Sequence, residues 1–178
     1  MPAEYIMRRK VLPVLLMDEK TIKTRRLMLR NWAETDRDDF IKLSEDPHIS
    51  EWTGRSVPAS ELFSYYLQTG TAFAVLYEGK TIGNFSLFRN SLTRGIRAVN
   101  VMECAFYTLP QFHGQGLGSE ALKALLEYAR NEQRADAVIC GSYSSNERSL
   151  RFIKRNGGAY CFSRELPSGK TEEFFVFA

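Results

Sequence analysis

The sequence contains few of the side chains from which metal centres and disulfide frameworks are built. It has 178 residues but only two histidines, His48 and His113, and three cysteines. Because neither histidine has a paired cysteine or acidic residue at metal-ligand spacing, we expect no metal site. Cys104, Cys140 and Cys161 are odd in number, far apart, and each lies in an apolar run. We therefore expect reduced, buried thiols, with neither a disulfide nor a catalytic cysteine.

The sequence also lacks a strong excess of one charge and any long apolar segment. Lys plus Arg number 24 and Asp plus Glu 21, a net charge of +3, and the basic residues never form a block of five. This balance favours neither nucleic acid nor a membrane as a partner. The apolar stretch at 11–17 is far shorter than the ~20 residues that span a bilayer, and it lacks a signal-peptide cleavage site. We expect a cytoplasmic protein.

Length and patterning predict one domain at 23–178, preceded by a leader or an extra strand at 1–22. Apolar spacing and turn residues divide the domain into elements. Helices are predicted at 36–44 with Thr35 as N-cap, at 60–69, from Leu117 onward, and at 147–156. Strands are predicted at 24–30, 71–77, 81–88, 98–109, 137–143, 159–166 and 171–178, with a loop at 46–58 and a polar turn at 89–97. This order predicts a mixed α/β sheet with helices on its faces.

The most informative segment is the glycine-spaced loop that follows the strand at 98–109. Gly114, Gly116 and Gly118 carry no Cβ, so a phosphate group can approach the main chain closely. The helix that begins at Leu117 adds unsatisfied N–H groups and partial positive charge at its N-terminus. Such a loop suits a pyrophosphate-bearing cofactor, although three glycines also make a tight strand-to-helix turn.

Two other phosphate-binding loops fit this segment poorly. A mononucleotide loop requires Gly-Lys followed by Ser or Thr, and the text Gly116-Leu117-Gly118-Ser119 contains no lysine. The dinucleotide fingerprint is G-x-G-x-x-G with an acidic residue after the next strand, whereas here the spacing is G-x-G-x-G and Asp136 precedes that strand. An oxidoreductase of the Rossmann type is therefore disfavoured.

The run His113-Gly114-Gln115-Gly116-Leu117-Gly118 resembles motif A (Q/R-x-x-G-x-G/A) of the GNAT acyltransferase superfamily, with His113 in the Gln/Arg position. The resemblance covers roughly 24–178. It implies a mixed, α+β-like fold whose central, mostly antiparallel sheet contains a splayed strand pair flanked by helices. It also implies acetyl-CoA as co-substrate. The residues that would bind it are Phe106, Tyr107, Thr108, His113, Gly114, Gln115, Gly116, Leu117, Gly118, Ser119 and Asn146.

Further text resembles the enzymes of this superfamily that acetylate the N-termini of ribosomal proteins. Residues 24–30 resemble their T-x-R-L-x-L-R opening, although an alternating basic edge strand produces the same text. Residues 103–118 fit their pattern E-x-G-Y-x-L-x-P-x-x-W-G-x-G in spacing, with departures at Ala105 and His113. In that family the strand before the glycine loop pairs with the pantetheine arm, here through 106–108.

A third stretch resembles the family's N-x-x-S/A motif. Asn146 would hydrogen-bond the pantetheine amide, act as the N-cap of its helix, or do both. Many members carry a tyrosine seven residues later that protonates the departing thiolate, and Ile153 stands at that position. Ser149 is the nearest hydroxyl that the motif offers for this role.

Transfer of an acyl group to an amine requires a proton acceptor, because a free amine is largely protonated at neutral pH. Glu103 is the only acidic residue of the cofactor strand and is our candidate base, acting directly or through water. Alternatively, it pairs with an arginine such as Arg30 across the sheet. A main-chain N–H near Phe106 would polarise the thioester carbonyl.

The acceptor amine is the least determined part of the prediction. His48, Trp52, Tyr160 and Phe162 are candidates for the wall of its cleft, although Trp52 fits a core position equally well. A protein N-terminus, an amino acid, a polyamine and a drug amine all remain open, as do a monomer and a homodimer. The sequence predicts an acetyl-CoA-dependent N-acetyltransferase. The alternative is a coenzyme A-binding regulatory module without catalysis.

Overall fold

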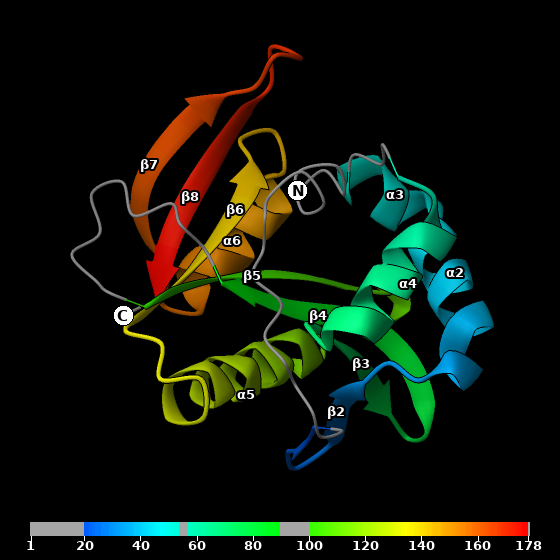
Figure 1. Cartoon of the computed structure of the whole chain (residues 1–178). Helices are drawn as coiled ribbons and strands as arrows, with labels where there is room; N and C mark the ends of the chain where they lie inside the picture. The colour runs from blue at the N-terminus through cyan, green and yellow to red at the C-terminus, as the bar shows by residue number, and fades with distance from the viewer. Residues whose placement is uncertain (1–19, 54–56, 90–99, 178) are drawn as a thin grey trace.

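The computed structural model describes residues 20–53, 57–89 and 100–177, which fold around one sheet (Figure 1). The strands lie in the order β1-β2-β3-β4-β5-β6-β8-β7, and every neighbouring pair is antiparallel except β5 and β6. Their bounds are β1 Thr21–Lys23, β2 Leu27–Asn31, β3 Ala72–Tyr77, β4 Lys80–Arg89, β5 Val101–Thr108, β6 Ala137–Tyr143, β7 Ala159–Glu165 and β8 Thr171–Phe177. This confirms the predicted fold class.

Helices cover both faces of the sheet. The helices are α2 Arg37–Glu45, α3 Pro47–Thr53, α4 Ala59–Thr69, α5 Leu117–Asn131 and α6 Glu147–Arg155, with short 3-10 turns η1 Glu34–Asp36 and η2 Pro110–Phe112. One apolar cluster joins α5 and α6 to one face, and a second joins α2, α3 and α4 to the other (Figure 1). Central β4 is consequently buried on both sides over most of its length.

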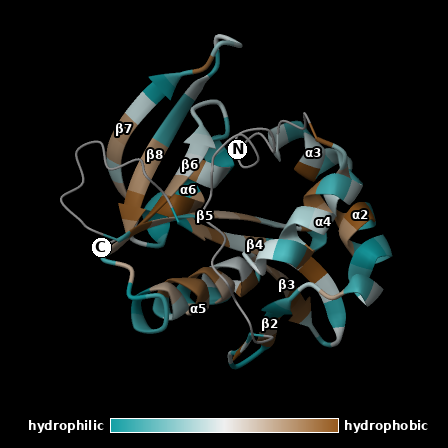
Figure 2. Ribbon diagram, viewed as in Figure 1, coloured by the Kyte–Doolittle hydropathy of each residue, from teal (hydrophilic) through white to brown (hydrophobic). Residues whose placement is uncertain are grey.

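Helix α5 has the amphipathic pattern predicted from its sequence. Ala121, Leu122, Leu125, Tyr128 and Ala129 are buried against the sheet, at the helical spacing of three to four residues. The helix is apolar on part of its surface and hydrophilic on the rest (Figure 2). Its burial fixes the position of the N-terminal turn, where the glycine loop ends.

Strands β5 and β6 are paired only along their first halves. The parallel register ends at the pair Glu103–Ile139, whereas β5 continues to Thr108 and β6 to Tyr143. Within the described residues, the second halves of these two strands therefore share no ladder. This is the predicted splayed pair, and it opens a gap in the middle of the sheet.

The prediction of one strand at 24–30 is wrong in its first half. Residues 24–26 form a turn between β1 and β2, in which the Thr24 hydroxyl accepts a hydrogen bond from the Leu27 N–H (2.9 Å). The turn consists of Thr24, Arg25 and Arg26 and contains no glycine or proline, so the usual turn signals do not reveal it. Residues 1–19 and most of the predicted turn at 89–97 lie outside the described residues.

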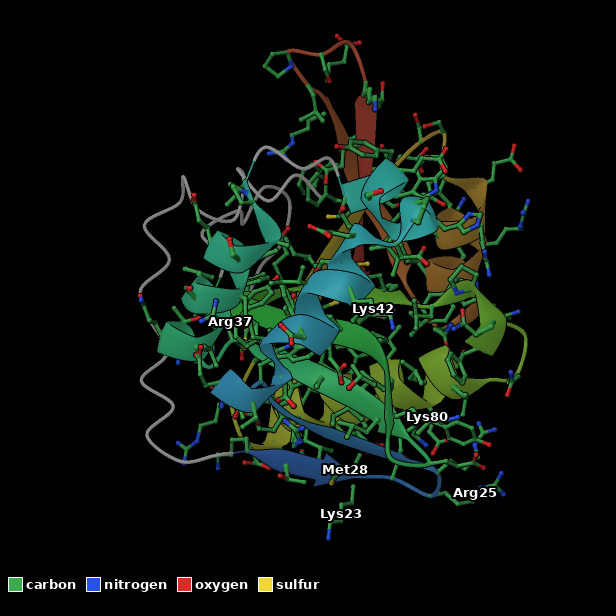
Figure 3. The ribbon with its side chains drawn as sticks, turned by 90° about the vertical axis from the view of Figure 1, so that its right-hand side faces the viewer. Lys23, Arg25, Met28, Arg37, Lys42 and Lys80 are labelled. Carbon is green, nitrogen blue, oxygen red and sulfur yellow. The ribbon has the colours of Figure 1, made fainter. Side chains whose placement is uncertain are left out.

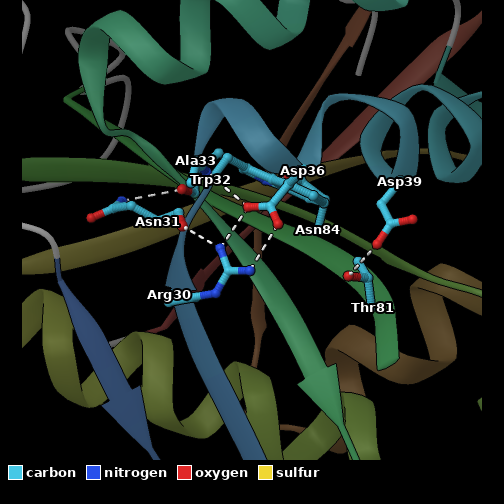
Figure 4. Close-up of polar contacts among 9 residues, drawn as sticks. Arg30, Asn31, Trp32, Ala33, Asp36, Asp39, Thr81 and Asn84 are labelled. Atoms are coloured by element: carbon cyan, nitrogen blue, oxygen red, sulfur yellow. Dashed lines mark hydrogen bonds and ion pairs between the residues drawn. The ribbon is translucent and has the colours of Figure 1, made fainter. Parts of the chain in front are cut away.

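The start of α2 also differs from the prediction. Thr35 is not its N-cap, because η1 precedes the helix and α2 begins at Arg37. The Asp36 carboxylate accepts a hydrogen bond from the Ala33 N–H (2.8 Å) and forms a bidentate pair with Arg30 (2.6 and 2.8 Å; Figure 4). The Arg30 guanidinium holds the pKa of Asp36 below its usual value, against the effect of burial.

The predicted loop at 46–58 contains a helix, α3, and this prediction was wrong. The Asp46 side chain accepts a hydrogen bond from the His48 N–H (3.0 Å), and its carbonyl accepts from Ile49 and Ser50. Asp46 thus begins the helix, and Pro47 follows at its first position, where a missing N–H costs nothing. The Asp-Pro pair was the sequence signal for this helix.

Candidate functional site

A cavity of about 770 Å³ lies at the gap between β5 and β6. One end is lined by the glycine loop and the first turn of α6, and the other by residues of α2, α3 and α4. The second halves of β5 and β6 line the middle. The cavity therefore connects the predicted cofactor loop with the predicted acceptor side through the sheet.

The glycine loop has the backbone that its sequence predicts. Gly114 and Gly116 both have φ near +76°, a conformation that suits glycine, and Gly116 is the N-cap of α5 without a side-chain cap. The first N–H groups of α5 are therefore offered to a ligand. Of the predicted loop residues, the cavity is lined by His113, Gly114, Gly116, Gly118 and Ser119.

Gln115 and Leu117, two further predicted cofactor residues, do not line the cavity. Leu117 is buried in the core under α5. The Gln115 side chain donates a hydrogen bond to the Gln111 carbonyl (3.1 Å), and its own carbonyl accepts one from Arg26 (3.0 Å). Neither side chain faces the cavity, so these two residues could contribute to the cofactor site only through their main-chain groups.

Hydrogen-bond alternation shows which main-chain groups of β5 face the gap. The Leu109 N–H donates to the Ile82 carbonyl (2.8 Å), and bonding groups alternate along an antiparallel pair. The main-chain groups of residues 105 and 107 therefore point to β4, and those of Phe106 and Thr108 point toward β6. Phe106, Tyr107 and Thr108 all line the cavity. An extended ligand along this edge would find the N–H and carbonyl of Phe106 facing it.

His113 ties the glycine loop to the end of β5. Its Nε2 lies 2.8 Å from the Thr108 carbonyl and 3.0 Å from the Thr108 hydroxyl. Because a carbonyl oxygen can only accept, Nε2 carries the proton and donates to it. His113 thus satisfies one main-chain group that the splay leaves without a strand partner. The resemblance to motif A did not indicate this contact.

Asn146 and Ser149 stand at the start of α6, where the motif predicts them. The Asn146 side chain accepts a hydrogen bond from the Ser149 N–H (3.0 Å), so the N-cap role is confirmed. Both residues line the cavity. The capping bond uses the Asn146 oxygen and leaves the amide hydrogens as donors on that wall. Ile153 is buried in the core, so the position of the family's tyrosine carries no proton donor.

The acceptor side of the cavity is lined mostly by aromatic and uncharged polar residues. His48 and Trp52 line it from α3, as predicted. Tyr160 and Phe162 do not line it, and that expectation is corrected. Their strand β7 is at the edge of the sheet, and β8 separates it from β6 and the cavity. Tyr160 is 57% exposed and packs edge-on against Phe175, whereas Phe162, beyond a bulge at residue 161, stacks on Phe174.

The sequence did not predict three polar residues of this wall, Ser44, Asn84 and Tyr66. Ser44 and Tyr107 bring their hydroxyl oxygens within 3.2 Å of each other. Asn84, on β4, accepts a hydrogen bond from the Trp32 indole (2.8 Å; Figure 4). Burial raises the pKa of the nearby Tyr66, so its phenol stays protonated at ordinary pH. These residues come from elements that are far apart in sequence, and no local motif marks them.

Glu103 is not among the residues that line the cavity. Its side chain is 3% exposed, and the residue stands at the last paired position of β5, one residue before Cys104, which does line the cavity. Arg30, the cation considered as its partner, is engaged by Asp36, and β3 and β4 separate its strand from β5. The geometry therefore supports no direct contact between Glu103 and a ligand in the cavity.

Charge in the cavity lining is positive. Arg148, Arg151 and Arg155 follow one another along α6 beside the glycine loop. Among the described residues, no group of three or more His, Cys, Asp or Glu side chains could hold a metal ion. Nor does any helix of the described ranges have the length and apolarity needed to cross a membrane. Cys104 and Cys140 are buried free thiols, whereas Cys161 is only half-buried.

The chain is similar to known acetyltransferases in sequence and in fold. A family model described as an acetyltransferase (GNAT) domain matches residues 26–159. The structure is similar to that of a GNAT-family acetyltransferase from Bacillus anthracis, with TM-score 0.74 and 18% identity over 89% of this chain and 98% of that chain. It is also similar to the apo form of RimL, a ribosomal L7/L12 alpha-N-protein acetyltransferase, with TM-score 0.73 and 14% identity over 89% and 94%.

A third similar structure, an acetyltransferase from Agrobacterium tumefaciens, has TM-score 0.71 and 18% identity over 89% of this chain and 94% of that chain. Identities this low show the shared fold, while the family model covers most of the chain. The protein belongs to the GNAT acetyltransferases and is an acetyl-CoA-dependent acetyltransferase.

Proposed function

We propose that this protein transfers the acetyl group of acetyl-CoA to a primary amine by direct attack, in a complex that holds both substrates at once. The observation that carries the proposal is the single cavity that joins the glycine loop to the α3–α4 side. A donor held at the loop would extend along β5, and its thioester would meet an acceptor that enters from the opposite face.

The glycine loop would hold the pyrophosphate. Gly114 and Gly116 leave room for phosphate oxygens next to the main chain, and the N–H groups at the start of α5 would donate to them. Asn146 would donate from its amide to the pantetheine arm. The arginines of α6 add positive charge beside a ligand of high negative charge. The residues present thus fit acetyl-CoA.

The chemistry would be divided between main chain and side chains. The Phe106 N–H, which faces the gap, would polarise the thioester carbonyl. Ser149 would supply a proton to the departing thiolate. Glu103 would take the proton from the amine through water, since its carboxylate lies behind the cavity wall. No metal takes part in this mechanism.

The acceptor would be a protein N-terminus or a small-molecule amine. Similarity of residues 24–30 and 103–118 to enzymes that acetylate ribosomal proteins makes an N-terminal peptide the first acceptor to test. The cytoplasm is the proposed compartment, because the described cysteines are free thiols.

The test is turnover of acetyl-CoA against a panel of amines, with and without a metal chelator. N-terminal peptides, lysine peptides, amino acids, polyamines and aminated drugs would each be incubated with the protein, and acetylated product detected by mass spectrometry. We expect one class to be acetylated at the same rate in the chelator. Tight acetyl-CoA binding without product from any amine would favour the regulatory-module alternative. Loss of activity on chelation, restored by one ion, would contradict the metal-free mechanism.

A further inference from the structure

We propose that Arg26 is a positioning residue for the pyrophosphate-binding loop. The inference rests on the proposed binding of acetyl-CoA by that loop. Together with Thr24 and Glu120, Arg26 forms what we call the loop clamp, a set of hydrogen bonds that joins the β1–β2 turn to the start of α5. None of these three residues lines the cavity, so the clamp would act on the cofactor through the backbone of the loop.

The contacts of the loop clamp are short and converge on one carboxylate. Oε1 of Glu120 accepts from the Thr24 hydroxyl (2.6 Å) and from the Arg26 N–H (2.8 Å), and Oε2 accepts from Arg26 Nε (2.7 Å). Burial alone would raise the pKa of Glu120, but the hydrogen bonds from Thr24 and Arg26 outweigh it and hold that pKa below its usual value. The carboxylate therefore stays charged and keeps the guanidinium in place.

From that position Arg26 reaches the loop itself. Its Nη1 donates to the Gln115 carbonyl (3.0 Å), and its Nη2 is 3.5 Å from the place that a Cβ on Gly116 would occupy. In a trans peptide the carbonyl and the next N–H point in opposite directions, and the described residues contain no cis bond. Because Arg26 holds the Gln115 carbonyl on its own side, the Gly116 N–H is turned to the other side, and Gly116 lines the cavity.

The orientation of this peptide matters for an anionic ligand. An N–H that faces the cavity can donate to a phosphate oxygen, whereas a carbonyl turned the same way would repel it. Glycine at φ +76° offers little resistance to rotation of its neighbouring peptides. The clamp would therefore remove a conformational freedom that the glycines themselves introduce, and would present the loop ready to bind.

The clamp also accounts for the T-x-R text of residues 24–26. Lys23 and Arg25, the basic neighbours, point outward at the β1–β2 end (Figure 3), and both are exposed. Arg26 alternates with them and turns toward α5, where its side chain is 30% exposed. Arg26 thus differs from Lys23 and Arg25 in its contacts with α5 and the glycine loop, and not in its charge.

The experiment compares Arg26→Ala and Arg26→Lys with two controls. Arg25→Ala removes the exposed neighbour. Arg30→Ala breaks the ion pair with Asp36 (Figure 4), which is of similar length and exposure but lies near the other end of β2. For each folded protein, the Kd of coenzyme A and the KM and kcat with acetyl-CoA are measured. The same constants are measured with S-acetylpantetheine, a donor without the pyrophosphate.

We expect Arg26→Ala to weaken coenzyme A binding by about 10- to 100-fold, the worth of a charge-assisted hydrogen-bond set. Arg26→Lys should be intermediate, because an ammonium cannot hold Glu120 and the Gln115 carbonyl in the same fixed fork. With S-acetylpantetheine all variants should resemble the parent, as should both controls with coenzyme A. Equal loss with both donors, or unchanged affinity in Arg26→Ala, would overturn the positioning role.

Glu120→Ala gives a second test, in which the loop clamp and simple electrostatics predict opposite changes in the affinity for coenzyme A. It also provides a test if Arg26→Ala does not fold. Removing an acidic residue beside an anion site should tighten binding if only charge matters. The clamp predicts weaker binding, because Arg26 loses its anchor. Tighter binding would overturn the inference while leaving the proposed function intact. A parent protein that does not bind coenzyme A would overturn both.

Discussion

Replacing Gly116 with valine is expected to weaken acetyl-CoA binding by about 100-fold or more, equivalent to roughly 2.7 kcal/mol. Gly116 has φ near +76°, where a β-branched residue is strained, and it lines the cavity at the N-terminus of α5. The new side chain would reshape the loop and occupy space next to the N–H groups that would hold the pyrophosphate. The measurement is calorimetric titration of the folded variant with acetyl-CoA.

Gly169→Val is the matched control for this experiment. Gly169 has φ near +77° in the turn between β7 and β8, a Cβ there would meet no atom within 4 Å, and the residue does not line the cavity. The Gly169→Val protein should therefore have the same backbone strain as Gly116→Val and bind acetyl-CoA as tightly as the parent. If a folded Gly116→Val protein bound acetyl-CoA as tightly as the parent, the assignment of the loop to the pyrophosphate would be wrong.

Glu103→Gln is expected to lower turnover by about 10²–10⁴, the usual contribution of a positioned general base. Acetyl-CoA affinity should be nearly unchanged, because the proposed contacts to the cofactor come from the main chain and Asn146. The defect should shrink as the pH rises, since a larger share of the amine is then already neutral. The measurement is kcat/KM across pH for both proteins with the best amine of the panel.

Glu172→Gln is the control for Glu103→Gln, because it removes the charge of a buried carboxylate that has no proposed role as a base. Glu172 is fully buried, pairs with Arg164 (2.6 Å), and lies next to Gly141 of the cavity wall. Loss of the Glu172 charge should lower the stability of the protein, but it should not produce a pH-dependent defect in turnover. A Glu103→Gln protein that turns over like the parent at every pH would make Glu103 structural. A defect independent of pH would indicate lost positioning of the substrate.

The sequence predicted the fold where periodicity and local motifs determine structure. Helix α5 and the glycine loop were predicted correctly because apolar spacing and glycine conformation are local properties. Helix α3 was missed because its apolar face is short, although Asp46 and Pro47 marked its start. The turn at 24–26 was missed because it contains no glycine or proline, and because two of its hydrogen bonds go to Glu120, 94 and 96 residues away.

The site was predictable on the cofactor side and much less so on the acceptor side. The loop residues and Asn146 lie in continuous motifs, and the structure brings most of them to one cavity. The polar wall of Ser44, Tyr66 and Asn84 is assembled from α2, α4 and β4, so its members share no sequence pattern. Tyr160 was misplaced because the order of the strands, which local patterns do not reveal, puts β7 at the edge of the sheet with β8 between it and β6.

The central claim is that one cavity holds donor and acceptor together, so that the amine attacks the thioester directly. Cys104 also lines that cavity, and it is the nucleophile on which an acetyl-enzyme would form if transfer took two steps. A hydrogen bond with Cys104, burial and the neighbouring Glu103 raise the pKa of Cys140, so the adjacent thiol on β6 is disfavoured as an alternative nucleophile. Initial rates measured while acetyl-CoA and the best amine are both varied distinguish the two routes. The account predicts lines that intersect in the double-reciprocal plot and no acetylated protein after incubation with acetyl-CoA alone. Parallel lines with an acetyl group on Cys104 would contradict it.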